Sequence, residues 1–317
     1  MKQAVLAAAD RIGLFALARR ASAARLRILA YHGLWTTPGF QYGDRLFMPP
    51  DQFERRMTRL KRSGYPVLGL DAAVTALAAG ELPANAVVIT IDDGWASTHA
   101  HMLPILEALG LPSTVYVTSW YVGHGLPVVN KAVDYLHARA AGDTARAKPI
   151  ADAIDALPYA AREAALRDLT AALGLPLDWW ETRQFHSMTP AEVADCVRRG
   201  MDVQLHTHRH RAAPDSLARE LEENRARLAE WTGLPSAHFA HFCYPSGEYQ
   251  LAAEPILAAQ GVRSATLVDQ GTNAPGAHRY RLRRFLDGRS VGDAEFDAYL
   301  AGALDVVDAI ASRARRG

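Results

Sequence analysis

Two short segments carry the side chains whose types and spacing could do chemistry. The segment TIDDG, residues 90–94, places two adjacent carboxylates and a glycine after a β-branched run. The segment LHTHRH, residues 205–210, places three histidines after another apolar run. Two imidazoles and one carboxylate form a known ligand set for catalytic zinc, which leaves one coordination position for water. Together the two segments supply three such ligands and a spare carboxylate beside them.

Each segment has a simpler interpretation when it is taken alone. Asp-Asp-Gly is also an ordinary turn sequence. Histidine clusters also occur in solvated loops, and we expect His208 and Arg209 to be solvated loop residues. His206 and His210 are four residues apart, which places them on one face if the segment turns helically. Adjacent strand residues point to opposite faces, so Asp92 and Asp93 can reach one site only where their strand ends. The conjunction of the two segments therefore favours a metal site over two unrelated loops.

The elements that must position these residues alternate along the chain. Short apolar or β-branched runs predict strands at 27–31, 87–91, 114–118, 202–205, 239–244 and 264–268. Helical spacing predicts helices at 51–62, 97–109, 191–199, 216–231 and 253–260. Strands that alternate with helices indicate a parallel α/β sheet or barrel, in which the carboxyl ends of the strands form one face. Both chemical segments follow predicted strands, so they should meet at that face.

Three parts of the chain depart from this alternation. Residues 130–185 are Ala-rich and helical in pattern, which predicts a helical insertion that covers the site, contacts a partner or is simply scaffold. We expect an amphipathic N-terminal segment at 1–25, a catalytic domain at 26–290 and a C-terminal part at 291–317. The last part should contain a helix from Asp293 to about Arg313.

The N-terminal segment has two interpretations. Residues 2–27 predict a short helix with basic residues around an apolar side, which comprises Val5, Ala8, Ala9, Ile12 and Phe15. This helix could dock on the domain, or it could lie on an anionic membrane as a peripheral contact. Asp10 and Arg11 interrupt the apolar run that a signal peptide needs, which favours a cytoplasmic, possibly membrane-associated protein.

The composition of the chain limits the classes of protein to which it can belong. The chain has 317 residues, of which 49% are hydrophobic and 22% are charged, so a large buried core is expected. The net charge of +1 offers no basic excess for nucleic-acid binding. Cys196 and Cys243 are far apart and lack CxxC spacing, so no disulfide framework is implied.

Taken together, the motifs resemble those of the polysaccharide deacetylases of the NodB-homology type, carbohydrate esterase family four. Residues 90–94 match the family's TFDDG motif with Ile in place of Phe, and residues 206–210 match its H-[ST]-x-x-H motif. The segment FCYPSGEY at 242–249 looks like the third motif, and YHG at 31–33 looks like the opening strand end. The resemblance runs from about residue 26 to 290, with the helical insertion outside it.

This resemblance implies a distorted parallel (β/α) barrel with about seven strands. It also implies that Asp92 is the general base, and that Asp93, His206 and His210 hold a divalent metal. Zinc suits these ligands best, and cobalt, nickel or manganese also fit. A backbone N–H of the third motif, here that of Ser246, would stabilise the oxyanion.

The implied reaction removes N-acetyl groups from amino sugars of a bacterial surface polysaccharide or exopolysaccharide, or of its lipid-linked precursor. A bound metal lowers the pKa of its water towards about 7, and Asp92 can take a proton as that water attacks. The carbohydrate would be the only partner besides a membrane surface. Tyr244, Trp95 and Arg284 are candidate substrate contacts, and Trp95, Trp120 and Tyr121 could stack on sugar rings or belong to the core.

The chain departs from the family pattern at two positions. Many relatives carry in the third motif an Arg that contacts the base, and Cys243 stands there in this chain. Arg284 could orient Asp92 instead, or it could form a surface salt bridge. Cys243 is expected to be a small buried residue rather than a nucleophile.

The late L-x-H motif, which often supplies the general acid, corresponds to residues 280–285 and has no histidine. Candidates for the acid are His32, Asp92 returning its proton and, as a weaker choice, His278. Two other functions stay open: an amidase or deformylase acting on a small amide, and a glycan-binding or assembly protein without catalysis.

Overall fold

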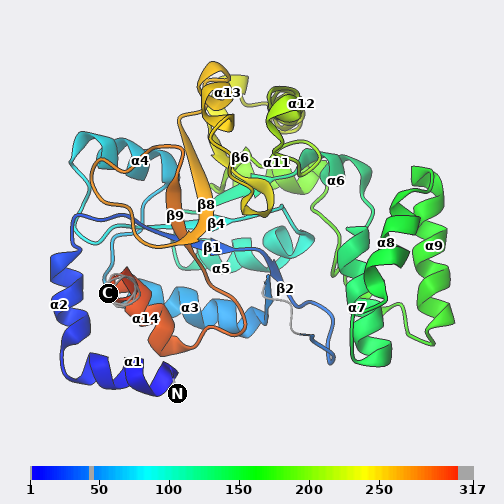
Figure 1. The fold of residues 1–317 in the computed structure, drawn as a ribbon, viewed down its shortest axis with the longest axis horizontal. Helices are drawn as coiled ribbons and strands as arrows, with labels where there is room; N and C mark the ends of the chain where they lie inside the picture. The colour runs from blue at the N-terminus through cyan, green and yellow to red at the C-terminus, as the bar shows by residue number, and fades with distance from the viewer. Residues whose placement is uncertain (1, 43–45, 306–317) are drawn as a thin grey trace, which may run out of the picture.

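Seven parallel strands close into a barrel at the centre of the protein (Figure 1). The computed structural model describes residues 2–42 and 46–305. Strand β1 pairs with both β4 and β9, so the last strand closes on the first. The barrel strands, in their order around it, are β1 (Arg27–Tyr31), β4 (Val87–Ile91), β5 (Thr114–Val117), β6 (Asp202–Leu205), β7 (His241–Cys243), β8 (Ser264–Gln270) and β9 (Leu282–Leu286). The predicted barrel with about seven strands is confirmed.

Most strands form where the apolar runs predicted them. Strands β1, β4 and β6 have the predicted bounds, whereas β7 is shorter than the predicted 239–244 and β8 extends to Gln270. Strand β9 was not predicted, because Arg283 and Arg284 interrupt its apolar pattern. Arg284 is nevertheless buried. Side chains alternate between the two faces of a strand, and the side chain of Arg284 is on the face of β9 that points into the barrel.

Helices cover the outside of the barrel (Figure 1). The five helices predicted between residues 51 and 260 outside the insertion form with bounds that differ by at most two residues, whereas α4 (Leu70–Ala79) and α6 (Ser119–His124) were not predicted. The stretch predicted as a helix at 97–109 begins with a π-helical turn, η1 (Thr98–Met102). The other helices of the barrel layer are α3 (Pro50–Arg62), α4 (Leu70–Ala79), α5 (Leu103–Ala108), α6 (Ser119–His124), α11 (Pro190–Arg198), α12 (Pro214–Thr232), α13 (Ala253–Ala259) and α14 (Asp293–Leu300), with short 3-10 turns η2 (Ser236–His238) and η3 (Pro245–Gly247).

The segment between β5 and β6 is helical, as predicted, and lies beside the barrel on the right of Figure 1. It contains α7 (Val129–Ala141), α8 (Ala147–Asp155), α9 (Tyr159–Ala172) and α10 (Asp178–Glu181). Its apolar cluster includes Trp95, together with Phe47 of the small two-stranded sheet β2 (Gly33–Leu34) and β3 (Phe47–Met48). The insertion therefore shares its core with the loop that follows β4.

Backbone pairing also ties the insertion to that loop. Residues at its end pair in antiparallel fashion with the loop after β4, through the bridge between Trp95 and Ser187. The N–H of Ala96 donates to the carbonyl of His186, and the N–H of Met188 donates to the carbonyl of Gly94. The insertion is thus fixed directly against the first chemical motif.

The N-terminal segment differs from the prediction. It forms two helices, α1 (Lys2–Arg11) and α2 (Leu14–Ala21), because Gly13 adopts a left-handed conformation with φ 82° and turns the chain. The predicted apolar side is only partly confirmed: Phe15 is buried as expected, whereas Val5, Ala8 and Ile12 face outward. Leu6 and Ala18, which were not assigned to that side, are buried with Phe15.

The predicted C-terminal helix is interrupted at residues 301–302, and residues 303–305 are helical again. Helix α14 ends at Leu300, and Gly302 has a left-handed backbone with φ 74°. The rest of the predicted helix, residues 306–313, lies outside the described residues. Within residues 2–42 and 46–305, none of the helices combines the length and apolar character that a membrane crossing requires. Both cysteines are buried and free.

Candidate active site and metal centre

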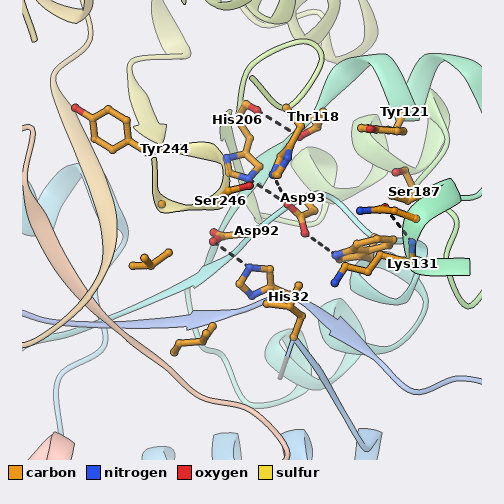
Figure 2. Close-up of a pocket in the computed structure, with 18 residues that line it drawn as sticks. His32, Asp92, Asp93, Thr118, Tyr121, Lys131, Ser187, His206, Tyr244 and Ser246 are labelled. Carbon is orange, nitrogen blue, oxygen red and sulfur yellow. Dashed lines mark hydrogen bonds and ion pairs between the residues drawn. The ribbon is translucent and has the colours of Figure 1, made fainter. Parts of the chain in front are cut away.

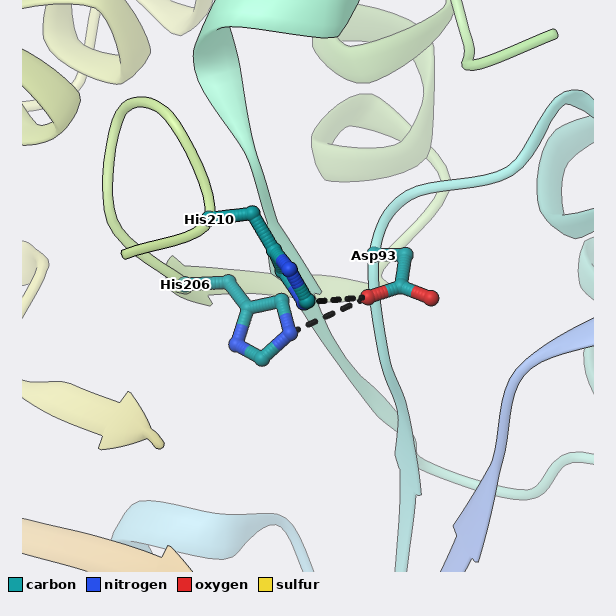
Figure 3. Close-up of side chains that lie close together, drawn as sticks. All are labelled: Asp93, His206 and His210. Atoms are coloured by element: carbon teal, nitrogen blue, oxygen red, sulfur yellow. Dashed lines mark hydrogen bonds and ion pairs between the residues drawn. The ribbon is translucent and has the colours of Figure 1, made fainter. Parts of the chain in front are cut away.

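Asp93, His206 and His210 meet at the carboxyl ends of the barrel strands (Figure 3). One potential ligand atom from each lies within 4.8 Å of the other two. The Nε2 atoms of His206 and His210 lie 3.1 and 3.3 Å from the same Asp93 oxygen, Oδ1. The structure thus brings together the three residues expected to hold a metal, from loops more than 100 positions apart in the sequence.

Left-handed backbone positions aim these side chains. Asp93 has φ 72°, which rotates its carboxylate away from the strand alternation and towards the site that Asp92 also faces. Thr207 and His210 have φ 63° and 58°, so the two histidines converge through an irregular loop and not through the helical turn that their spacing suggested. Non-glycine residues rarely adopt such values, and they concentrate at functional sites where surrounding contacts hold them.

Hydrogen bonds outside the trio orient His206 and Asp93. The Nδ1 of His206 donates to the carbonyl of Cys243 at 2.9 Å, which leaves Nε2 as the nitrogen that faces Asp93. The indole N–H of Trp95 donates to Asp93 Oδ2 at 2.9 Å. Metal-binding histidines and carboxylates ordinarily have such outer partners. The donor set and its surroundings therefore fit a divalent cation.

Two buried residues tie the motif loops together. Thr118 donates its backbone N–H to the Asp93 carbonyl and its hydroxyl to the His206 carbonyl, both at 3.3 Å. Asn224 of α12 accepts from the His206 backbone N–H at 3.1 Å and donates to the carbonyl of Val117. The histidine loop is thus fixed to the end of β5 and to α12.

The electrostatics keep Asp93 ionised. Burial raises the pKa of this carboxyl, but hydrogen bonds from His206 and His210, with the charge of His32, outweigh it and hold the pKa well below its usual value. For His206 burial lowers the pKa, but the hydrogen bond and the charge of Asp93 outweigh burial, so the net direction of the pKa is upward. An anionic carboxylate between two imidazoles is the charge state that a cation requires.

Asp92 is held inside the barrel by Arg284 of β9. Both side chains are buried, and the guanidinium grips the carboxylate with two parallel contacts of 2.7 Å, Nη1 to Oδ1 and Nη2 to Oδ2. Its other N–H groups donate to the Leu267 carbonyl, the Thr90 hydroxyl and the Cys243 sulfur. All five guanidinium donors thus have acceptors.

This pairing decides the open question about Arg284. The residue is 1% exposed and does not line the cavity, so it orients Asp92 and is not available as the substrate contact also considered for it. Burial raises the pKa of Asp92, and the charges of Arg284 and His32 more than offset this, so the net direction is downward. The Cys243 sulfur lies 3.6 Å from Asp92 Oδ2, and burial strongly raises the pKa of that thiol, which argues against a nucleophile.

His32 lies beside Asp92 in the cavity (Figure 2). Its Nε2 is 3.6 Å from Asp92 Oδ2, its side chain is 10% exposed, and its Nδ1 has no partner among the described residues. Burial lowers the pKa of this imidazole despite the nearby carboxylates. The weaker candidate acid, His278, is 48% exposed, lies 3.6 Å from Glu254 and does not line the cavity.

A cavity of about 340 Å³ opens over these groups. Barrel loops supply one wall, with Tyr244 and Ser246, and the insertion supplies the opposite wall, with Val128, Asn130 and Lys131 (Figure 2). Ser246 has a left-handed backbone with φ 56°. The insertion, whose role the sequence left open, therefore forms part of the site.

The aromatic candidates divide between wall and core. Tyr121 lines the cavity, whereas Trp120 lies outside its lining and stacks on His124 with ring centroids 4.2 Å apart. Trp95 and Tyr244 line the cavity but are only 3% and 1% exposed, so little ring surface is available to a sugar.

The sequence analysis missed Thr118, Asn224, Asn130 and Lys131. A signal existed only for Asn224, which lies on the apolar stripe of α12 formed by Leu217, Leu221 and Leu228, where a polar residue is unexpected.

Comparisons with known proteins agree with this geometry. The family model described as polysaccharide deacetylase matches residues 79–141 and 142–265, which is more than half of the chain and includes the insertion. YxkH, a protein of Bacillus subtilis (strain 168) whose name assigns it to the polysaccharide deacetylases, is 30% identical over 102 residues. That alignment covers 32% of this chain and 34% of YxkH, so only about a third of the relative is matched.

Solved structures share the fold at low identity. The deacetylase PplD of Streptococcus pyogenes, in complex with acetate, has a TM-score of 0.60 and 17% identity, covering 88% of this chain and 98% of PplD. IcaB of Ammonifex degensii has a TM-score of 0.60 and 18% identity, with 87% and 97% covered. A de-N-acetylase of Aggregatibacter actinomycetemcomitans has a TM-score of 0.58 and 16% identity, with 87% and 99% covered.

Proposed function

The chain belongs to the polysaccharide deacetylase family, and from that premise we propose that it is a metal-dependent N-deacetylase. Its substrate would be an N-acetylated amino sugar in a bacterial surface polysaccharide or exopolysaccharide, or in the lipid-linked precursor. The observation that carries the proposal is the convergence of Asp93, His206 and His210 beside an Arg-clamped Asp92. Acetate in the PplD structure is the product expected of this chemistry.

Asp93, His206 and His210 would hold the metal, with zinc preferred for two imidazoles and a carboxylate. When bound, such a cation supplies Lewis-acid activation of the amide carbonyl and of an attacking water. His206 keeps its Nε2 available because its Nδ1 faces the Cys243 carbonyl. Trp95 holds the second oxygen of Asp93, which fixes the orientation of the first.

Asp92 is the general base in this proposal. Its carboxylate takes a proton from the water as the new C–O bond forms at the acetyl carbon. The low pKa that Arg284 and His32 give it keeps the group ionised at neutral pH. The backbone N–H of Ser246, in the cavity wall, would donate to the developing oxyanion.

The C–N bond then breaks, and the leaving amine needs a proton. His32 lies beside Asp92 in the cavity wall, with an unpartnered ring nitrogen among the described residues. We assign the proton delivery to His32, in relay with the proton that Asp92 has taken. The products are acetate and a free amino sugar.

The test is release of acetate, with matching appearance of free amine, from chemically defined N-acetylated oligosaccharides. We expect activity that a chelator abolishes and zinc restores, and an Asp92→Asn variant that keeps its metal but loses about 10²–10⁴ in kcat. Glycan binding that persists in chelator, without acetate release under any metal, would support a non-catalytic role and overturn the proposal. Turnover only of small non-carbohydrate amides would assign the site to a different amidase.

A further inference from the structure

The outward side of the N-terminal helices is unusually apolar. Val5, Ile12, Leu14 and Leu17 are 62%, 76%, 48% and 64% exposed. They are four of the seven large hydrophobic side chains that are exposed in the described part of the chain, and they fall within 13 residues. Val5 and Ile12 are two helical turns apart, and Leu14 and Leu17 are one turn apart, so each pair shares a side of the backbone.

The inner side of the same helices is apolar as well. Leu6, Phe15 and Ala18 are buried in the main core cluster, and α1 and α2 pack against α14. A surface helix normally presents polar residues outward, whereas a helix that is apolar all round has a second contact. The outer apolar side of α1 and α2 contributes nothing to the fold described here.

The segment that exposes these apolar side chains also carries an excess of positive charge. Residues 2–21 contain four basic residues and one Asp, a net charge of +3, whereas the rest of the chain carries −2 because the total is +1. Arg11 and Arg20 are exposed. Arg19 is partly buried and lies over the Tyr65 ring, with its Cζ atom 4.2 Å from the ring centroid. The cationic excess of the protein is thus concentrated where the exposed apolar side chains are.

We propose that α1 and α2 dock peripherally on an anionic lipid surface. Val5, Ile12, Leu14 and Leu17 would enter the boundary between headgroups and acyl chains, and Arg11 and Arg20 would contact lipid phosphates. Charge complementarity selects an anionic lipid. A second copy of the chain is a poorer fit, because stable protein interfaces involve about 20–30 residues on each side and this surface spans about half as many.

The docking surface is separate from the cavity of the proposed deacetylase, so its test can be read independently of catalysis. The full chain is floated with phosphatidylcholine vesicles, with and without phosphatidylglycerol. We expect flotation only with the anionic vesicles and a decrease when salt is raised. Acetate release from a soluble oligosaccharide is measured in parallel, and should be the same for all variants.

Two variants remove the two components of the surface. Replacing two arginines should reduce partitioning by about 25-fold, or about fivefold for each cation. Removing the four apolar side chains should abolish flotation, and melting curves check that these exposed substitutions leave the fold intact. The charge variant is Arg11→Gln with Arg20→Gln, and the apolar variant combines Val5→Ser, Ile12→Ser, Leu14→Ser and Leu17→Ser.

Matched controls change equivalent side chains elsewhere on the surface. Arg198 and Arg227 have side chains that are 69% and 53% exposed, and Leu157 and Leu251 are 37% and 65% exposed. The controls Arg198→Gln with Arg227→Gln, and Leu157→Ser with Leu251→Ser, should float like the parent protein. The proposal is overturned if the parent stays in solution, binds neutral vesicles equally or loses binding in the controls. It is also overturned if the apolar variant converts a dimer to a monomer, since a second copy would then cover the face.

Discussion

Replacing Arg284 by methionine should damage both the stability and the activity of this protein. The guanidinium donates five hydrogen bonds inside the barrel, two of them to Asp92 at 2.7 Å. Methionine fills part of the volume but leaves the Asp92 carboxylate buried without its cation. A lysine has three donors in a different geometry and cannot reproduce the planar grip, so Arg284→Lys should be impaired too.

The magnitude follows from the burial of the pair. Asp92 and Arg284 are 2% and 1% exposed, so solvent cannot replace the lost contact. Removing one partner of a buried ion pair typically costs about 3–5 kcal/mol of unfolding free energy. Domains of this kind have total stabilities of about 5–15 kcal/mol, so the cost is survivable except at the lower end of that range, and the folded fraction is measured before the kinetics. The loss of orientation at Asp92 should lower kcat by about 10²-fold, with a smaller effect on KM.

The assay combines urea unfolding with acetate-release kinetics on metal-loaded protein. A second variant separates positioning from folding: the Cys243 sulfur lies 3.6 Å from Asp92, so an arginine at position 243 can approach the carboxylate from β7. We expect Cys243→Arg in the Arg284→Met background to recover activity over Arg284→Met alone. Full kcat in folded Arg284→Met would refute the positioning role.

Three further predictions concern other residues of the site and the core. Asp92→Asn should lower kcat by about 10²–10⁴ with unchanged zinc content by elemental analysis, because Asp92 is the base and not a ligand; loss of zinc would reverse that assignment. Trp95→Phe removes the N–H that holds Asp93 and should weaken zinc affinity by about 10–100-fold in a competition titration, whereas unchanged affinity would leave Trp95 a packing residue only. Burial raises the pKa of Asp287 to about 6, above its unfolded value near 4, so its protonated form favours the folded state. This contribution to the free energy of unfolding is complete below about pH 4 and is lost as the pH rises through about 6. Urea unfolding should therefore show that the parent loses about 3 kcal/mol of unfolding free energy relative to Asp287→Asn across this window. If the unfolding free energies of the two proteins change in parallel with pH, the prediction is wrong.

The sequence predicted the parts of the fold that repeat locally. Strand β4 is an uninterrupted apolar and β-branched run, and β1 and β6 are mostly apolar or alternating runs. The bounds of all three agree with the predicted ranges. Strand β9 was missed because a charged residue that points into a barrel looks, in sequence, like one that points to solvent. The N-terminal apolar side was predicted correctly for Phe15 but not for Val5 and Ile12, since Gly13 breaks the single helix on which that prediction depended.

For the site, the spacing of the motifs predicted which residues lie together but not the backbone conformation that brings them together. In the loop after β6, Thr207 and His210 have left-handed backbone conformations that bring the two histidines together. Helical periodicity in the sequence does not predict such conformations. The partner of Asp92 was undecided because Arg284 lies 192 positions away, and only closure of the barrel brings the two together. The insertion wall, with Asn130 and Lys131, likewise depends on tertiary pairing between the insertion and the loop after β4.

In this chain the guanidinium that holds Asp92 belongs to Arg284. Where many relatives are expected to place an arginine in the third motif, the chain has Cys243, and the guanidinium comes from β9 instead. The acid and base of the proposed reaction, His32 and Asp92, lie side by side within the same cavity.

The most direct test of the account is the position of a metal in crystals grown with zinc, located by anomalous scattering at the zinc edge. The account predicts one strong peak about 2.0–2.2 Å from the Nε2 atoms of His206 and His210 and from a carboxylate oxygen of Asp93. Zinc-loaded crystals with no peak between these three side chains would contradict it.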